Sequence, residues 1–126
     1  MSLPTFNIPP IGPKQGKIWG NTQLVFAWND TEAHFLRGEK GHKCSRHYHT
    51  HKWNRFFVCV GRLKITTFTE SGTADETIIG PNQPTDVPPG VEHFFEVMED
   101  SLAMEFYWVG LDANDITRID EGGPVE

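Results

Sequence analysis

The strongest constraint on the fold of this chain is a regular succession of short segments rich in β-branched and aromatic residues, each bounded by Gly, Pro, Asn or Asp. No segment keeps a helical period of 3.6 residues for three turns, whereas Leu63–Phe68 alternates apolar and polar side chains as a half-buried strand does. Short strands separated by turn residues are typical of sandwiches and barrels. The sequence therefore predicts an all-β fold with strands over 22–28, 32–37, 43–49, 56–60, 63–68, 76–79, 85–87, 93–97 and 102–109.

Turn signals and chain ends divide the sequence further. Gly61-Arg62 is expected to form a tight turn, and residues 70–73 are the next hairpin signal. A chain of 126 residues is one domain in length. We expect residues 1–18, which are rich in Pro and Gly, to form an extended arm, residues 19–120 a single barrel, and residues 121–126 a loose tail.

Composition excludes several classes of partner. The formal net charge is −6 and the basic residues are scattered, which argues against nucleic acid and anionic membranes. No apolar run is long enough to span a membrane, and the first residues lack the features of a secretory signal. Cys44 and Cys59 are therefore expected to be reduced and packed in the interior of a cytoplasmic protein, with Cys44 as a thiolate ligand the less favoured alternative.

Histidine spacing points to a metal site. His47 and His49 lie two residues apart, and a strand places such residues on the same face. His93 follows a Pro-Pro-Gly turn in a distant segment and can supply a third imidazole. Because neutral imidazole is the commonest protein ligand for transition metals, we predict one divalent ion (Zn, Fe, Ni or Mn) held by these three residues. His51 is in phase with His49, and is either an alternative ligand or a rim residue that points to solvent.

The residues around the histidines resemble the two motifs of the cupins. The first cupin motif is G-x5-H-x-H-x3-4-E-x6-G, and the second contains P-x-G-x2-H. The matching positions here are Gly41, His47, His49, Asn54, Gly61 and then Pro88, Gly90 and His93. This resemblance implies a cupin-type double-stranded β-helix, which is a jelly-roll barrel of two antiparallel sheets, with a metal ion at its centre.

Asn54 is the main departure from the cupin pattern, because the family has a metal-binding Glu there. An amide oxygen is neutral and a weaker ligand than a carboxylate, so an ion held by three His and Asn54 is more Lewis-acidic and less tightly bound. Asn54 or water is expected to complete the coordination shell. Three-His cupins that act as dioxygenases also lack this Glu.

A narrower resemblance concerns three short flanking segments. Lys17–Gly20, Cys44-Ser45 and Asp115–Asp120 are similar to the small cupins related to the C-terminal domain of type II mannose-6-phosphate isomerases. This resemblance implies chemistry on a sugar phosphate or a sugar nucleotide.

A strand period of two predicts which side chains line the cavity. If Asn54 faces inward, Val60 does so as well, and Val97 faces inward with His93. We expect Phe106 and Trp108 to share the lining, with Glu105 and Tyr107 on the opposite face, although aromatic residues can equally fill a small barrel. The predicted lining is Phe56, Val58, Phe95, Phe106 and Trp108.

Other charged residues give weaker indications, and no catalytic residue can be named. Arg37 and Lys64 could bind an anionic group, or they are solvated strand residues. Glu92 and Glu96 are candidates for a general acid or base, but Glu92 is expected to point outward.

These observations predict a metal-binding small cupin that binds a small molecule. It would be a metal-dependent, isomerase-like enzyme acting on a small polar substrate such as a sugar phosphate, and the alternatives are a non-catalytic binding protein and a three-His Fe(II) dioxygenase-like enzyme. We also expect a homodimer, because Leu24, Phe26 and the arm carry apolar surface and sheets of this class have open edges.

Overall fold

The structure, a computed structural model, describes residues 15–110, 112 and 114–125. These residues form strands and turns, and the described part of the chain contains no helix. The strands are β1 (Gln15–Lys17), β2 (Gly20–Trp28), β3 (Thr31–Gly38), β4 (His42–Lys43), β5 (His47–Tyr48), β6 (Trp53–Phe68), β7 (Ala74–Ile79), β8 (Pro84–Val87), β9 (His93–Trp108), β10 (Thr117–Arg118) and β11 (Gly123–Pro124).

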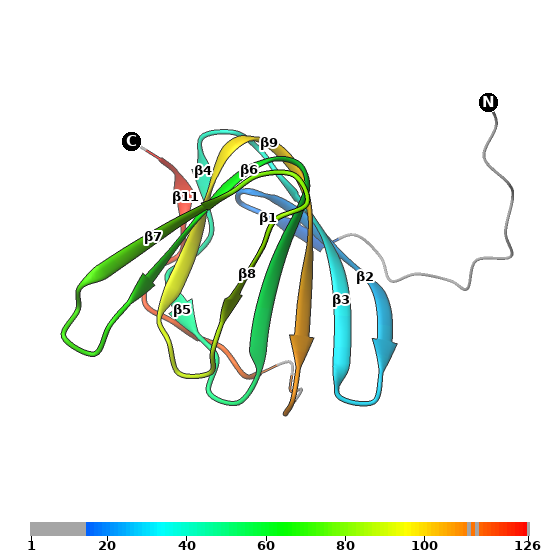
Figure 1. Ribbon diagram of the computed structural model, residues 1–126, viewed down its shortest axis with the longest axis vertical. Coiled ribbons are helices and arrows are strands. Elements are labelled where there is room, and N and C mark those ends of the chain that lie inside the picture. Colours follow the sequence, from blue (N-terminus) through cyan, green and yellow to red (C-terminus); the bar gives the residue numbers. More distant parts are fainter. Residues whose placement is uncertain (1–14, 111, 113, 126) are drawn as a thin grey trace, which may run out of the picture.

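Two long strands, β6 and β9, organise the fold. Each has 16 residues, and they pair with each other in antiparallel register from one end to the other. Because both strands bend, the sheet curls around an interior, with β2 and β3 continuing one side and β4, β5 and β11 lying on the other (Figure 1). The predicted all-β, jelly-roll class is confirmed, with the two halves of the barrel joined through β6 and β9 into one 11-stranded antiparallel sheet.

The bend in β6 lies where the sequence predicted a turn, and that prediction is wrong. β6 continues through Gly61, which has φ of 95°, and its register against β9 shifts between Val58 and Leu63. A Cβ atom at Gly61 would collide with Ser101 on β9, so only glycine allows the two strands to approach here. The irregularity also changes the side-chain phase, so Val60, predicted to face inward, has 59% of its surface exposed.

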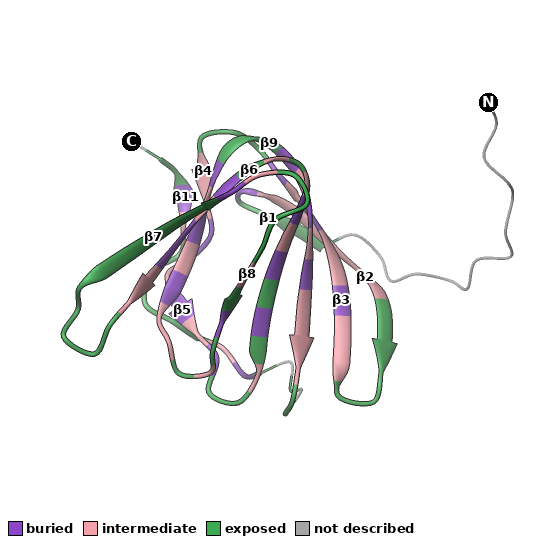
Figure 2. Cartoon of the chain, in the orientation of Figure 1, coloured by how far each residue is buried: buried purple, intermediate pink, exposed green. Residues whose placement is uncertain are grey.

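The core fills the interior of the curled sheet. Alternate residues of β6 are buried on either side of the bend, which gives the banded pattern in Figure 2. Phe56 and Val58 lie before the bend, and Phe95 and Val97 follow His93, all four facing inward as the period of two predicts. The core also contains Trp19, Leu36, Cys44, Leu63, Ile65, Ile79, Val87 and Ala103.

Two other segments differ from expectation. The predicted strand 43–49 is divided into β4 and β5, and the residues between them lie outside the strands. The tail predicted to be loose contains β11, in which Gly123 pairs with Lys43.

Of the predicted arm, residues 1–14 lie outside the described residues, and Gln15–Lys17 form β1 in a hairpin with β2. The hairpin predicted at 70–73 connects β6 to β7.

Candidate metal centre

Three imidazole rings meet inside the barrel. His47 lies on β5 and pairs across the sheet with His93, the first residue of β9, while His49 follows β5. Their ring centroids are 4.5 to 5.4 Å apart, and one ring nitrogen from each lies within 4.8 Å of the others. The structure therefore brings together the three histidines that the sequence singled out as ligands.

Backbone carbonyls fix the orientation of every ring. The Nδ1 atom of His47 is 2.6 Å from the carbonyl oxygen of Ser45, that of His49 is 2.7 Å from Asp115, and that of His93 is 2.9 Å from Val91. A carbonyl oxygen can only accept, so each Nδ1 carries the proton and donates it. Each Nε2 is left with a free lone pair, which is the arrangement of metal-binding histidines.

Several of the atoms available to an ion are buried and have no hydrogen-bond partner. In the described residues, the buried side-chain atoms without a hydrogen bond are Nε2 of His49, Nε2 of His93, Oδ1 of Asn54 and Oγ1 of Thr66. Three of these four belong to the predicted ligand set, so these residues fit a metal ion. Nitrogens bound to one tetrahedral ion at about 2.1 Å lie about 3.4 Å apart, so the rings would have to move closer together to share an ion.

The electrostatics of the site keep the rings neutral. Burial, followed by the neighbouring rings of His93 and His49, lowers the pKa of His47 to about 3. Burial also lowers the pKa of His93 to about 4, and it lowers the pKa of His49. Neutral imidazole is the form that binds a metal, so the free lone pairs are available throughout the physiological pH range.

A buried carboxylate lies beside Asn54. Glu105 on β9 accepts hydrogen bonds at the same oxygen from the hydroxyl of Tyr107 (2.6 Å) and from Nδ2 of Asn54 (3.3 Å). Because a carboxylate only accepts, this contact directs the amide nitrogen of Asn54 to Glu105 and leaves Oδ1 free. Burial raises the pKa of Glu105, although both hydrogen bonds act in the opposite direction.

The predicted lining is wrong at two of its five positions. Glu105 and Tyr107 line the cavity, whereas Phe106 and Trp108 lie on the other face of β9, beside Arg55. The reason is that β9 is unbroken, so the odd-numbered residues from His93 to Tyr107 face inward, except the exposed Glu99. Continuing the alternation of inward and outward side chains from His93 along the strand would have placed Glu105 in the cavity from the sequence alone.

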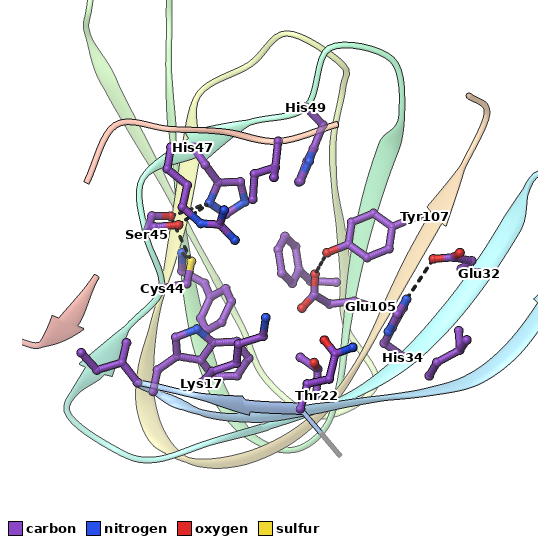
Figure 3. A pocket seen from close by; sticks show the side chains of 18 of the residues that line it. Lys17, Thr22, Glu32, His34, Cys44, Ser45, His47, His49, Glu105 and Tyr107 are labelled. Atoms are coloured by element: carbon purple, nitrogen blue, oxygen red, sulfur yellow. Dashed lines mark hydrogen bonds and ion pairs between the residues drawn. The ribbon is translucent and has the colours of Figure 1, made fainter. Parts of the chain in front are cut away.

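Two of the three imidazoles, those of His47 and His49, form part of the wall of a cavity of about 610 Å³. His47, His49 and Glu105 point into it, with Lys17 at the opposite wall (Figure 3). Phe56 and Phe95 also line it, while Val58 is buried in the adjoining core. The remaining ionisable side chains of the lining are those of Glu32, His34, Lys52, Arg118 and Glu121.

Two further candidate ligands lie apart from the imidazole group. His51 is exposed and is not a member of the group. Cys44 is buried, and burial raises the pKa of its thiol far above the usual range, so it is not a thiolate. Its sulfur accepts a hydrogen bond from the backbone N–H of Phe95, and the residue packs in the core as the favoured alternative predicted.

The charged residues suggested for acid–base or anion-binding roles are engaged elsewhere. Glu92 pairs with Arg46 at 3.0 Å, and Glu96 pairs with Lys64 at 3.2 Å. Arg37 contacts Asn21 and Gln23, and its guanidinium lies over the ring of Phe35. None of Glu92, Glu96, Arg37 and Lys64 lines the cavity.

Asp115 is a site residue whose role sequence reasoning missed. Its carbonyl orients His49, and its carboxylate accepts from the backbone N–H groups of Thr50, His51 and Lys52 at 2.6 to 3.2 Å. Burial raises the pKa of Asp115, but these three hydrogen bonds outweigh burial and the pKa is lowered. Asp115 was identified only as part of a family-like segment, because nothing in the spacing predicts contact with a loop 65 residues away.

Comparisons with known proteins support the fold. No protein-family model and no curated protein matches the chain. Oxalate decarboxylase from Bacillus subtilis at pH 4.6 is similar over 86% of this chain, with a TM-score of 0.76 and 15% identity. A structure of the same enzyme from work on its Mn(II) centres matches over 90% of this chain, with a TM-score of 0.76 and 14% identity.

This chain spans about a third of those structures, 30% and 32% of their lengths. At such low identity the likeness shows the fold alone, a curled antiparallel β-barrel that this chain shares with these structures. The described residues include no helix capable of crossing a membrane.

Proposed function

We propose that this chain is a metal-dependent cupin enzyme that holds one divalent transition ion and acts on a small polar substrate such as a sugar phosphate. The observation that carries the proposal is the set of three neutral imidazoles, each with Nδ1 bound to a carbonyl and one ring nitrogen facing the other two. A bound divalent ion would polarise a carbonyl or hydroxyl oxygen of the substrate.

The residues around the ion have definable roles. The three imidazoles and Oδ1 of Asn54 would hold it, and the cavity of about 610 Å³ is large enough for a small metabolite. Glu105 lines this cavity and contacts Asn54, a member of the ligand set. It can hold a proton at Oε1 or Oε2, which places a potential acid or base beside the bound substrate.

A second candidate is a three-His Fe(II) dioxygenase-like enzyme. The observation in its favour is that the group of close ligand atoms in the described residues contains imidazoles and no carboxylate. Oxygen uptake in the presence of Fe(II) and a panel of small substrates separates this candidate from an isomerase-like enzyme, which consumes no oxygen.

Metal analysis of the purified protein tests the proposal. We expect one divalent ion per chain in the wild type and none in the double variant His47→Ala/His49→Ala. The control is His51→Ala, an exposed imidazole outside the group, which should retain the metal. Wild-type metal content in the double variant would place the ion elsewhere. Metal binding without turnover of sugar phosphates and without oxygen uptake would instead support a non-catalytic binding cupin.

A further inference from the structure

Three cationic side chains, Lys17, Lys52 and Arg118, line the same cavity as His47 and His49, with Lys17 at the wall opposite these histidines (Figure 3). None of the three takes part in any of the ion pairs formed between described residues. Two of the carboxylates in the cavity wall are engaged, because Glu105 accepts from Tyr107 and Asn54, and Glu32 contacts the ring of His34 at 3.1 Å. The cavity therefore offers positive charge without a direct partner beside the candidate metal centre.

The register of β10 places Arg118 next to a candidate ligand. Arg118 lies directly opposite His47 in the antiparallel pair of β10 and β5. Residues directly opposite each other have side chains on the same face, with Cβ atoms about 5 Å apart. Since His47 points into the cavity, Arg118 extends along the same wall. Its positive charge is also one of the smaller causes that lower the pKa values of His47 and His49.

Lys52, which follows His49 by three residues in the sequence, also lines the cavity. Its ammonium group lies 4.1 Å from the centre of the Tyr107 ring, and it too contributes to the lowered pKa of His49. Burial lowers the pKa of Lys52, while Glu32, Asp115, Glu105 and Asp112 act in the opposite direction. These four carboxylates partly compensate the charge of Lys52, so Arg118 is the stronger of the two positive groups toward a ligand.

The charge balance of the site favours an anionic ligand. The proposed ligands, three imidazoles and an amide, are all neutral, so a divalent ion adds two positive charges that nothing in its own shell offsets. Arg118 and Lys52 add to this field. We propose that Arg118, assisted by Lys52, binds the anionic group of the small molecule that occupies this cavity, a carboxylate or a phosphate. The guanidinium can bind either group through two parallel hydrogen bonds.

This proposal rests on the proposed function only for the contact between the bound anion and the metal ion. Arg118 and Lys52 are present in the apoprotein as well. The first experiment therefore uses the full chain, freed of metal with a chelator. Binding of inorganic phosphate and of acetate is measured by calorimetry at low ionic strength. We expect Arg118→Gln to weaken binding about tenfold, the usual effect of one charge-assisted hydrogen-bonding group, and Lys52→Gln to weaken it less.

Matched controls remove a positive charge elsewhere. Arg62 and Lys40 are exposed, and neither side chain has an interaction within the described residues, so Arg62→Gln and Lys40→Gln should bind both anions as the wild type does. Arg118→Lys keeps the positive charge but lacks the planar guanidinium group. Its affinity for the two anions should therefore lie between those of the wild type and Arg118→Gln. Tighter binding of phosphate or of acetate identifies the class of anion that the cavity takes.

The second experiment repeats these titrations on protein loaded with Co²⁺ and records its visible absorption. Anion-dependent changes of the spectrum in the wild type, and weaker ones in Arg118→Gln at equal Co²⁺ content, are expected. Equal anion affinity in wild type and Arg118→Gln, or no binding of either anion to the wild type at millimolar concentration, would overturn the proposal. Failure to bind Co²⁺ combined with a clear effect of Arg118→Gln would refute the proposed function and leave the anion site standing.

Discussion

At the scale of single residues, the candidate centre is organised before any ion arrives. The three carbonyls that orient the imidazoles come from Ser45, Val91 and Asp115, which are distant in sequence. Because the rings are already directed, binding does not have to order three separate side chains. The same logic extends to Asn54, whose amide is oriented by Glu105.

Glu105→Gln tests this orientation of Asn54. A glutamine can donate as well as accept, so it no longer forces the amide nitrogen of Asn54 toward residue 105. We expect metal affinity to fall about tenfold, which is the lower end of the effect of removing a group that positions a ligand. Competition with a chromogenic chelator measures the affinity. Glu121→Gln removes an exposed carboxylate from the cavity wall and serves as the control; equal losses in both variants would contradict a specific role for Glu105.

Asn54→Glu restores the carboxylate of the cupin motif. We expect tighter metal binding, because a carboxylate offsets the charge of the ion. Without metal, the new carboxylate would lie beside Glu105, so the apoprotein should melt at a lower temperature than the wild-type apoprotein. Calorimetric melting with and without Zn²⁺ measures both effects. Unchanged metal affinity would show that residue 54 does not face the ion.

At the scale of elements, the bend in β6 depends on one glycine. Gly61→Ala combines a strained φ of 95° with a collision against Ser101, and we expect a loss of at least about 1–3 kcal/mol in the free energy of unfolding. Gly72 is a matched control, since it has φ of 85° but a Cβ atom added there would have no neighbour within 4 Å. Urea denaturation should show a larger loss for Gly61→Ala than for Gly72→Ala; equal losses would mean that the contact with Ser101 is unimportant.

The sequence predicted most of the strands, but not that β6 and β9 each run unbroken through two of the predicted segments. Local alternation identified the strands and the inward phase of Phe56 and Phe95, because a strand fixes its side-chain direction residue by residue. It failed at Gly61, where the outcome depends on which strand lies alongside, and at Glu105, where the strand phase was not continued from His93. A glycine between two apolar runs reads as a turn unless a partner strand is known to continue past it, and for β6 that partner is β9.

At the scale of the whole molecule, the stability of the apoprotein should depend on the buried imidazoles. In the unfolded chain histidine has a pKa of about 6.5, whereas His47 and His93 have folded values of about 3 and 4. The unfolded state therefore binds more protons over this range, and stability falls as pH decreases from about 6.5 toward 3. Urea unfolding at pH 7 and pH 5 in the presence of a chelator measures the loss.

The variant that checks this linkage is His93→Gln. It removes one buried imidazole, so the difference in stability between pH 7 and pH 5 should shrink. His51→Gln removes an exposed imidazole and should leave the difference close to that of the wild type. If both variants show the wild-type dependence on pH, other groups are responsible.

The outer surface of the barrel supports the predicted homodimer. Trp28 and Phe26 are 68% and 54% exposed, and Trp53 stacks on Trp108 nearby in the same sheet. Among the described strands, Leu24–Trp28 of β2 pair only with β3, which leaves an open edge beside these aromatics. We expect light scattering to give twice the 14.3 kDa mass of the chain at micromolar concentration.

Trp28→Glu should shift this assembly to the monomer, because it places a charge within the apolar surface. Ile78→Glu is the control, since Ile78 is 55% exposed on β7, a strand that pairs only with β6. A wild-type mass near 14.3 kDa would refute the dimer.

Asp115 also bears on when the chain becomes able to hold metal. Its carbonyl orients His49, and its carboxylate fixes the loop that follows, yet it comes 66 residues later in the chain than that histidine. During synthesis the three histidines leave the ribosome before the segment that aligns one of them. Full affinity for an ion can therefore arise only after the segment around Asp115 has docked. Nascent and truncated chains would be poor competitors for cellular metal, and metal content would serve as a measure of completed folding.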